Sequence, residues 1–195
     1  MNAQSTVTDQ ELIGRYLAGN QASLERLIRR HKNRVYAYIL MVVKDKELAE
    51  DLFQDTFIKV INTIRSGSYK EEGKFIQWVM RISHNLIIDY FRKSKRIPIV
   101  ENRDDFDIFE KVRIPVESVE ERLITEQIHK DVKKLIDFLP EEQREVLLMR
   151  HYGDMSFKDI AEVTNVSINT ALGRMRYALI NLRKLVQEND IILSS

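Results

Sequence analysis

The segment from Ser156 to Val186 has the pattern of two helices joined by a short turn, and it constrains the fold more than any other part of the sequence. Ser156 can cap the first helix, because Asp159 follows three residues later and can bond back to it. Asn165 falls in the turn, and asparagine tolerates left-handed backbone better than most residues. Ser167 can cap the second helix. The segment therefore predicts a helix-turn-helix.

The second helix of this motif has two faces of different character. Apolar residues recur at steps of three and four and predict a buried stripe, made of Ile168, Leu172, Met175, Leu179, Leu182 and Val186. The opposite face combines small, hydrogen-bonding and cationic side chains, which a DNA major groove accepts. The candidate DNA contacts here are Ser167, Asn169, Thr170, Gly173, Arg174, Arg176 and Tyr177. An ordinary helical hairpin with a solvated face fits the same pattern, since the motif alone is weakly specific.

The composition restricts the class of protein. The chain has 195 residues, enough for one or two compact domains, and its 6 Gly and 3 Pro favour long helices over a turn-rich β protein. It has no Cys, which excludes a disulfide framework and fits a reducing cytoplasm. No apolar run is long enough to span a bilayer, so we expect a cytoplasmic protein without membrane insertion. The net charge of +1 leaves any argument for nucleic-acid binding to local clusters.

The N-terminal half predicts a short helix followed by three long ones. Thr8 opens the short helix, with Glu11 as its capping partner. The long helices are expected at residues 21–43, 46–64 and 74–96. Trp78 falls in the apolar stripe of the last of these and is expected in the core. That helix also carries a polar line, which consists of Arg81, Asn85, Asp89 and Arg92.

Asp51, Gln54 and Asp55 form an acidic and polar patch on the predicted helix 46–64. Two carboxylates four residues apart could suggest a metal site, but no His or third carboxylate is placed to complete one. We therefore predict no metal and no cofactor. The patch is better interpreted as a docking surface for a basic or helical partner.

The chain is expected to be all-α, with two small helical domains at residues 5–97 and 118–187. Residues 98–117 change character: prolines bracket an acidic segment without helical periodicity, which predicts a flexible linker. Both domains end in basic helices. Two separated nucleic-acid surfaces on one flexible chain suit the recognition of two spaced elements of one duplex.

Four segments in this order carry a resemblance to a known family. They are LAEDLFQDTF, FIQWVMRISHNLIIDYFRKSKR, LPEEQREVLLMR and SFKDIAEVTNVSINTALGRMRYAL. Together they resemble the extracytoplasmic-function (group IV) sigma factors of the sigma-70 superfamily, which are bacterial promoter-recognition subunits of RNA polymerase. The resemblance implies a sigma2-like helical bundle, a sigma4-like helix-turn-helix domain, and promoter-specific transcription initiation through −10 melting and −35 binding.

The resemblance also implies partners and roles for individual residues. It implies that core RNA polymerase is bound through the clamp helices of its largest subunit, by Leu48, Asp51, Leu52, Gln54, Asp55 and Phe57. It implies contacts to the −10 element of promoter DNA from Ser66, Tyr69, Lys70, Arg81, Asn85, Asp89 and Arg92. The helix-turn-helix is implied to read the −35 element, near the flap of the second-largest subunit. Many members of the family are also held by an anti-sigma factor.

The chain departs from the family at one motif. Where many members have Val-Lys-Ser-Arg, this sequence has Ala171-Leu172-Gly173-Arg174, so its −35 preference does not follow from the resemblance. A stand-alone helix-turn-helix regulator is the main alternative, although it would need neither the Trp78 helix nor the acidic patch. No enzymatic activity is predicted, because the sequence lacks a phosphate-binding loop and a nucleophile elbow. Its four histidines also lack ligand spacing: His31, His84, His129 and His151.

Overall fold

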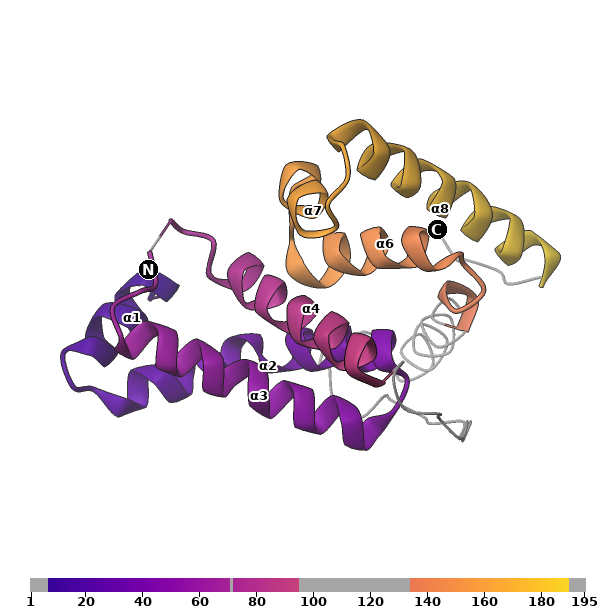
Figure 1. The fold of residues 1–195 in the computed structure, drawn as a ribbon. Helices are drawn as coiled ribbons and strands as arrows, with labels where there is room; N and C mark the ends of the chain where they lie inside the picture. Colours follow the sequence, from indigo (N-terminus) through magenta and orange to yellow (C-terminus); the bar gives the residue numbers. More distant parts are fainter. Residues whose placement is uncertain (1–6, 71, 95–133, 190–195) are drawn as a thin grey trace, which may run out of the picture. The chain divides into compact units, whose positions relative to one another are not determined.

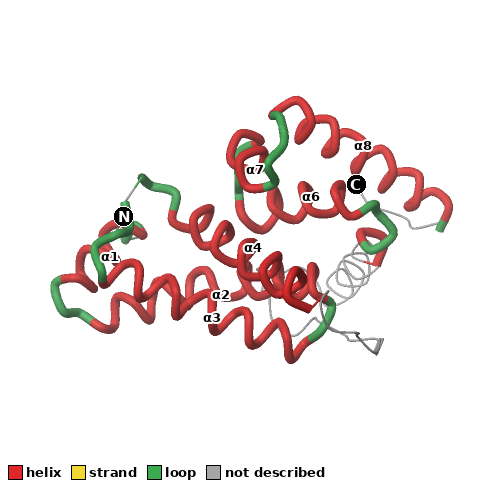
Figure 2. Tube along the Cα trace, in the orientation of Figure 1, coloured by secondary structure: helices red, strands yellow, loops and turns green. Residues whose placement is uncertain are grey.

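The computed structural model describes residues 7–70, 72–94 and 134–189, and every regular element in these ranges is helical (Figure 2). The α-helices are α1 (Asp9–Leu17), α2 (Gln21–Val43), α3 (Lys46–Arg65), α4 (Phe75–Ser94), α6 (Glu141–Gly153), α7 (Phe157–Val163) and α8 (Ile168–Glu188). The predicted all-α class is therefore confirmed.

The described residues divide into two compact units. The first contains those up to residue 94 together with Leu148–Ile168, and the second contains 134–147 and 169–189. The expected linker, residues 98–117, and residues 118–133 of the second expected domain lie outside the described residues. The expected domain boundaries therefore stay predictions.

The helix starts follow the capping signals of the sequence. The Oγ1 of Thr8 accepts from the Glu11 N–H at 3.2 Å, and the Thr8 N–H donates to Glu11 Oε2 at 2.7 Å. Ser156 and Asp159 exchange the same pair of bonds, each at 3.1 Å, at the start of α7. Asn165 has a φ of 54°, in the left-handed region. Both predicted capping boxes and the predicted left-handed turn residue are confirmed.

Helix α2 lies at the centre of the first unit, where it packs against α1, α3 and α4 (Figure 1). Val35, Tyr38 and Ile39 on α2 are fully buried. Two hydroxyl groups are buried with them, and each is satisfied within its own helix. Thr56 donates to the Leu52 carbonyl at 2.7 Å and Ser83 to the Val79 carbonyl at 3.0 Å. The core of this unit thus encloses these two hydroxyls without leaving either unpaired.

An acid–base cluster ties the start of α1 to α2. Asp9 accepts from Arg30, and its Oδ2 lies 2.8 Å from Nε2 of the buried His31. Burial alone would raise the pKa of Asp9, but the hydrogen bonds and charges of His31 and Arg30 lower it below the usual range. The cluster therefore holds Asp9 ionised in the folded protein.

In the second unit, one side of α8 is buried and is bonded to α6. Ala171 and Ala178 of α8 are fully buried, and Asn181 Nδ2 donates to Gln143 Oε1 on α6 at 2.8 Å. These three positions are spaced by seven and three residues, so they lie along one side of the helix. That side is the attached face of α8.

None of the helices within the described ranges combines the length and the hydropathy that a bilayer crossing would need.

Candidate nucleic-acid interface

The acidic patch predicted on α3 is present at the surface. Asp51, Gln54 and Asp55 are exposed, and Ile58, one turn beyond, is 55% exposed. Steps of three and four residues place the four side chains on one face of the helix. We name this line of Asp51, Gln54, Asp55 and Ile58 the α3 surface. It joins two carboxylates and an amide to an exposed apolar side chain, which is a combination suited to a protein partner.

Two residues expected to contact the polymerase do not reach this surface. Leu52 is 5% exposed and Phe57 6% exposed, so both pack inside the first unit. Leu48 is half-buried. The resemblance assigned polymerase binding to residues along one continuous segment, whereas adjacent residues of a helix point to different sides. Ile58 was missed, although its spacing from Asp51 and Asp55 could have placed it on the exposed face.

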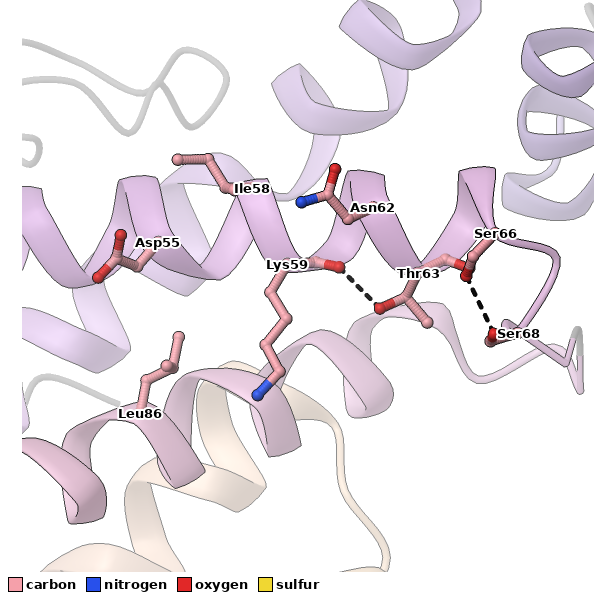
Figure 3. A pocket seen from close by; sticks show the side chains of 8 residues that line it. All are labelled: Asp55, Ile58, Lys59, Asn62, Thr63, Ser66, Ser68 and Leu86. Atoms are coloured by element: carbon pink, nitrogen blue, oxygen red, sulfur yellow. Dashed lines mark hydrogen bonds between the residues drawn. The ribbon is translucent and has the colours of Figure 1, made fainter.

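An open hollow of about 510 Å³ lies beside the α3 surface (Figure 3). It is lined by Asp55, Ile58, Lys59, Asn62, Thr63, Ser66, Ser68 and Leu86. The residues from Asp55 to Ser66 belong to α3 and its end, Ser68 to the following loop, and Leu86 to α4. The α3 surface therefore borders a depression large enough for side chains of a partner.

The loop after α3 carries three of the residues expected at the −10 element. Ser66 donates to the carbonyl of Thr63 and to Ser68 Oγ, both at 3.0 Å. The Tyr69 ring lies 4.4 Å from Trp78, between ring centroids, and Lys70 is exposed. Trp78 is half-buried, so the expectation that it is a core residue is only partly right. The loop thus presents hydroxyls, a cation and an aromatic pair together.

The polar line predicted on α4 is at the surface. Arg81, Asn85 and Arg92 are exposed and Asp89 is half-buried. Arg92 donates to Asp89 at 2.8 Å, and Arg81 donates to Glu162 of the same unit at 3.0 Å. Ion pairs this exposed contribute at most about 1 kcal/mol. Both arginines can therefore exchange their carboxylates for the phosphates of a nucleic acid.

The predicted buried stripe of α8 is wrong for three of its residues. Ile168 is 47% exposed, Leu172 43% and Leu179 40%. The fully buried positions are instead Ala171 and Ala178. Periodicity weights large apolar residues most heavily, whereas the fully buried positions of this helix are small residues. The attached face therefore lies less than a quarter of a turn from the expected one.

Because the buried side of α8 differs from the expected one, the residues expected at the −35 element differ in their exposure to solvent. The exposed group consists of Ser167, Asn169, Thr170, Arg176 and Tyr177. Arg174 belongs to the other group, because it is half-buried between Ala171 and Ala178 on the attached face. Gly173 faces open space: a Cβ added there would meet nothing within 4 Å.

Arg174 lies near Glu145 of α6, and its charge acts on that carboxylate. Burial raises the pKa of Glu145, Arg174 opposes the rise, and Glu141 and Glu142 add to it. A half-buried carboxylate among other acids needs a cation to stay ionised. Arg174 therefore supports the contact between α6 and α8.

Comparison with known proteins relates these surfaces to two regions of one family. The description "Sigma-70 region 2" matches residues 27–97, and "Sigma-70, region 4" matches residues 129–178. The chain belongs to the sigma-70 family. It is a member of the extracytoplasmic-function group, and it is not a stand-alone regulator with a helix-turn-helix only.

Relatives of this sigma factor match it over most of its length. The RNA polymerase sigma-H factor of Pseudomonas aeruginosa is 26% identical over 92% of this chain and 94% of its own. The ECF RNA polymerase sigma-E factor of Haemophilus influenzae is 26% identical over 87% of this chain and 90% of its own. The solved structure of CnrH in complex with the cytosolic domain of CnrY has the same fold, with a TM-score of 0.60, 21% identity, and 92% and 97% of the two chains covered.

The region matches contain the surfaces described above. The region 2 match includes all of α3 and α4, and the region 4 match includes α6, α7 and the first half of α8. In this sigma factor the helices of both regions thus carry exposed polar groups on one side and buried residues on the other.

Replacing Arg174 by Ala in this sigma factor is expected to destabilise the contact of α8 with α6. The free energy of unfolding should fall by about 1–2 kcal/mol, because Glu145 loses the charge that offsets its burial. Thermal unfolding followed by circular dichroism measures the change. The Arg174→Ala variant should distinguish between DNA sequences about as well as the wild type does.

The matched variant is Glu145→Gln, which removes the buried charge. Arg174→Ala in the Glu145→Gln background should be less destabilising than Arg174→Ala alone, because the buried charge that Arg174 offsets is already gone. Equal losses in both backgrounds would show that Arg174 acts independently of Glu145.

Proposed function

We propose that this sigma factor brings core RNA polymerase to promoters, melts the −10 element through its first unit and binds the −35 element through α8. The observation that supports this most directly is that three exposed surfaces lie within the residues matched by the two family regions. The α3 surface and the polar line of α4 fall within region 2, and the exposed residues in the N-terminal half of α8 fall within region 4.

The α3 surface is the proposed contact to the clamp helices of the largest polymerase subunit. Asp51 and Asp55 supply negative charge that can pair with a basic partner, and Ile58 supplies an apolar contact beside them. Interfaces of this kind derive most of their affinity from a few such side chains. The helix-turn-helix is proposed to lie against the flap of the second-largest subunit.

The −10 element is proposed to meet the loop after α3 and the polar line of α4. Flipping a base out of the duplex costs a few kcal/mol, which contacts to the flipped base and to phosphates must offset. Lys70, Arg81 and Arg92 supply cations, and the Tyr69–Trp78 pair supplies a surface on which a base can stack. No covalent chemistry is required of the sigma factor.

A protein that restrains this sigma factor is a second proposed partner. CnrH, which shares its fold, was solved in complex with the cytosolic domain of CnrY. A pull-down from cells with the tagged full chain tests the proposal, because a restraining protein and core polymerase should be recovered in separate complexes.

Run-off transcription with core RNA polymerase on fragments of the encoding genome tests the main proposal. Discrete transcripts are expected only when the sigma factor and the core enzyme are both present. Binding of the sigma factor to particular duplexes without polymerase, and no transcripts with it, would instead indicate a regulator that acts alone.

A further inference from the structure

Leu172 is an exposed apolar residue in the second turn of α8. It is 43% exposed, and its neighbours on this face are the polar and exposed Asn169 and Arg176 and the apolar Ile168, which is 47% exposed. We propose that Leu172 sets the promoter preference of this sigma factor by packing against the C5 methyl group of a thymine in the −35 element. The inference rests on the proposed function, in which α8 enters the major groove of that element.

The packing of α8 fixes the direction in which Leu172 points. Ala171 and Ala178 are fully buried, and Asn181 is bonded to Gln143 on α6. In a helix, a residue one position after Ala171 is rotated by about 100° from it. Leu172 is therefore turned away from the attached face.

Gly173 leaves the space beside Leu172 open. A Cβ at this position would meet nothing within 4 Å, so packing within the described residues does not require glycine here. Glycine inside a helix is less stable than alanine, and it allows another molecule to approach the backbone closely. The space next to Leu172 is thus free for a docked duplex.

The chemistry of the major groove then selects thymine. Base edges present donors and acceptors there, and the thymine methyl is the apolar group among them. Leucine has neither a donor nor an acceptor, so against any other edge it would remove water from a polar atom without replacing the hydrogen bond. Arg176, four residues on and exposed, can supply a phosphate or guanine contact beside it.

Deoxyuridine tests the contact, because it lacks only the methyl group of thymine. Each thymine of the −35 element, on either strand of a promoter used by the reconstituted holoenzyme, is replaced in turn by deoxyuridine. With the wild-type chain, initiation should fall roughly fourfold to tenfold at one position, as expected for the loss of a buried methyl contact.

Leu172→Ala should abolish this sensitivity to the methyl group. Leu179→Ala is the matched control, since Leu179 is 40% exposed on the same helix but two turns nearer its C-terminus, and it should keep the wild-type sensitivity. Both variants should melt close to the wild-type temperature, because each side chain is substantially exposed.

The outcomes separate this inference from the proposed function. If the wild-type holoenzyme initiates but tolerates deoxyuridine at every −35 position, or if Leu172→Ala shows the same fall as wild type, the role of Leu172 is overturned while the function stands. If the wild-type chain and core polymerase yield no promoter-specific RNA, the proposed function fails and the inference fails with it.

Discussion

Asp55→Arg is expected to weaken the binding of core RNA polymerase by about 2–4 kcal/mol, which is roughly 30-fold to 1,000-fold in affinity. The substitution reverses a charge in the middle of the α3 surface, between Asp51 and Ile58, and it places a long side chain at the edge of the neighbouring hollow. Fluorescence anisotropy of the labelled chain, titrated with core enzyme, measures the loss.

Glu50→Arg is the control for this prediction. Glu50 is an exposed carboxylate on the same helix, but it lies about a quarter of a turn away from the α3 surface. It should leave polymerase affinity close to wild type. Both variants should unfold at the wild-type temperature, because exposed substitutions rarely alter stability much. Wild-type affinity in the Asp55→Arg chain would exclude the α3 surface as the docking site.

Acidification from pH 7 to pH 4 is expected to lower the free energy of unfolding by about 2–3 kcal/mol through His84 alone. Burial lowers the pKa of this side chain to about 4, from an ordinary value of 6.5. Between these values the unfolded chain binds a proton that the folded chain does not, so stability is lost as the pH falls. Urea unfolding at a series of pH values measures the slope.

His84→Gln is the matched variant, because glutamine can still bond to the Tyr38 hydroxyl, which lies 3.2 Å from His84 Nδ1. Its stability should fall less steeply between pH 6.5 and pH 4 than that of the wild type, since the titrating group is gone. The difference between the two slopes isolates His84 from the carboxylates that also titrate in this range. Parallel curves for the two proteins would show that His84 does not titrate in the expected way.

Local signals in the sequence predicted most of the backbone. Capping is decided by residues three positions apart, so the boxes at Thr8 and Ser156 could be recognised without any tertiary information. The left-handed conformation of Asn165 is similarly a property of a single residue in a short turn. These features fix where helices begin and end, and hence the all-α class.

Whether each side chain is buried or exposed was predicted less well, because this depends on how the helices pack together. The sequence pattern assigned Leu172 to the core of the second unit and Arg174 to the surface, whereas Leu172 is 43% exposed and Arg174 is half-buried. Leu52 illustrates the same limit on α3, where family resemblance transferred a binding role to a residue that is 5% exposed. A candidate site inferred from sequence therefore needs the burial of each side chain before roles are assigned.

The two buried alanines of α8 also affect how this protein can diverge. Because the fully buried residues lie on one side of the helix, we expect substitutions on the outer side to affect the fold little. A new DNA preference could arise by exchange of Leu172 or Gly173 without any compensating change in the interior. Duplicated copies of such a gene could acquire separate sets of target genes in a few mutational steps.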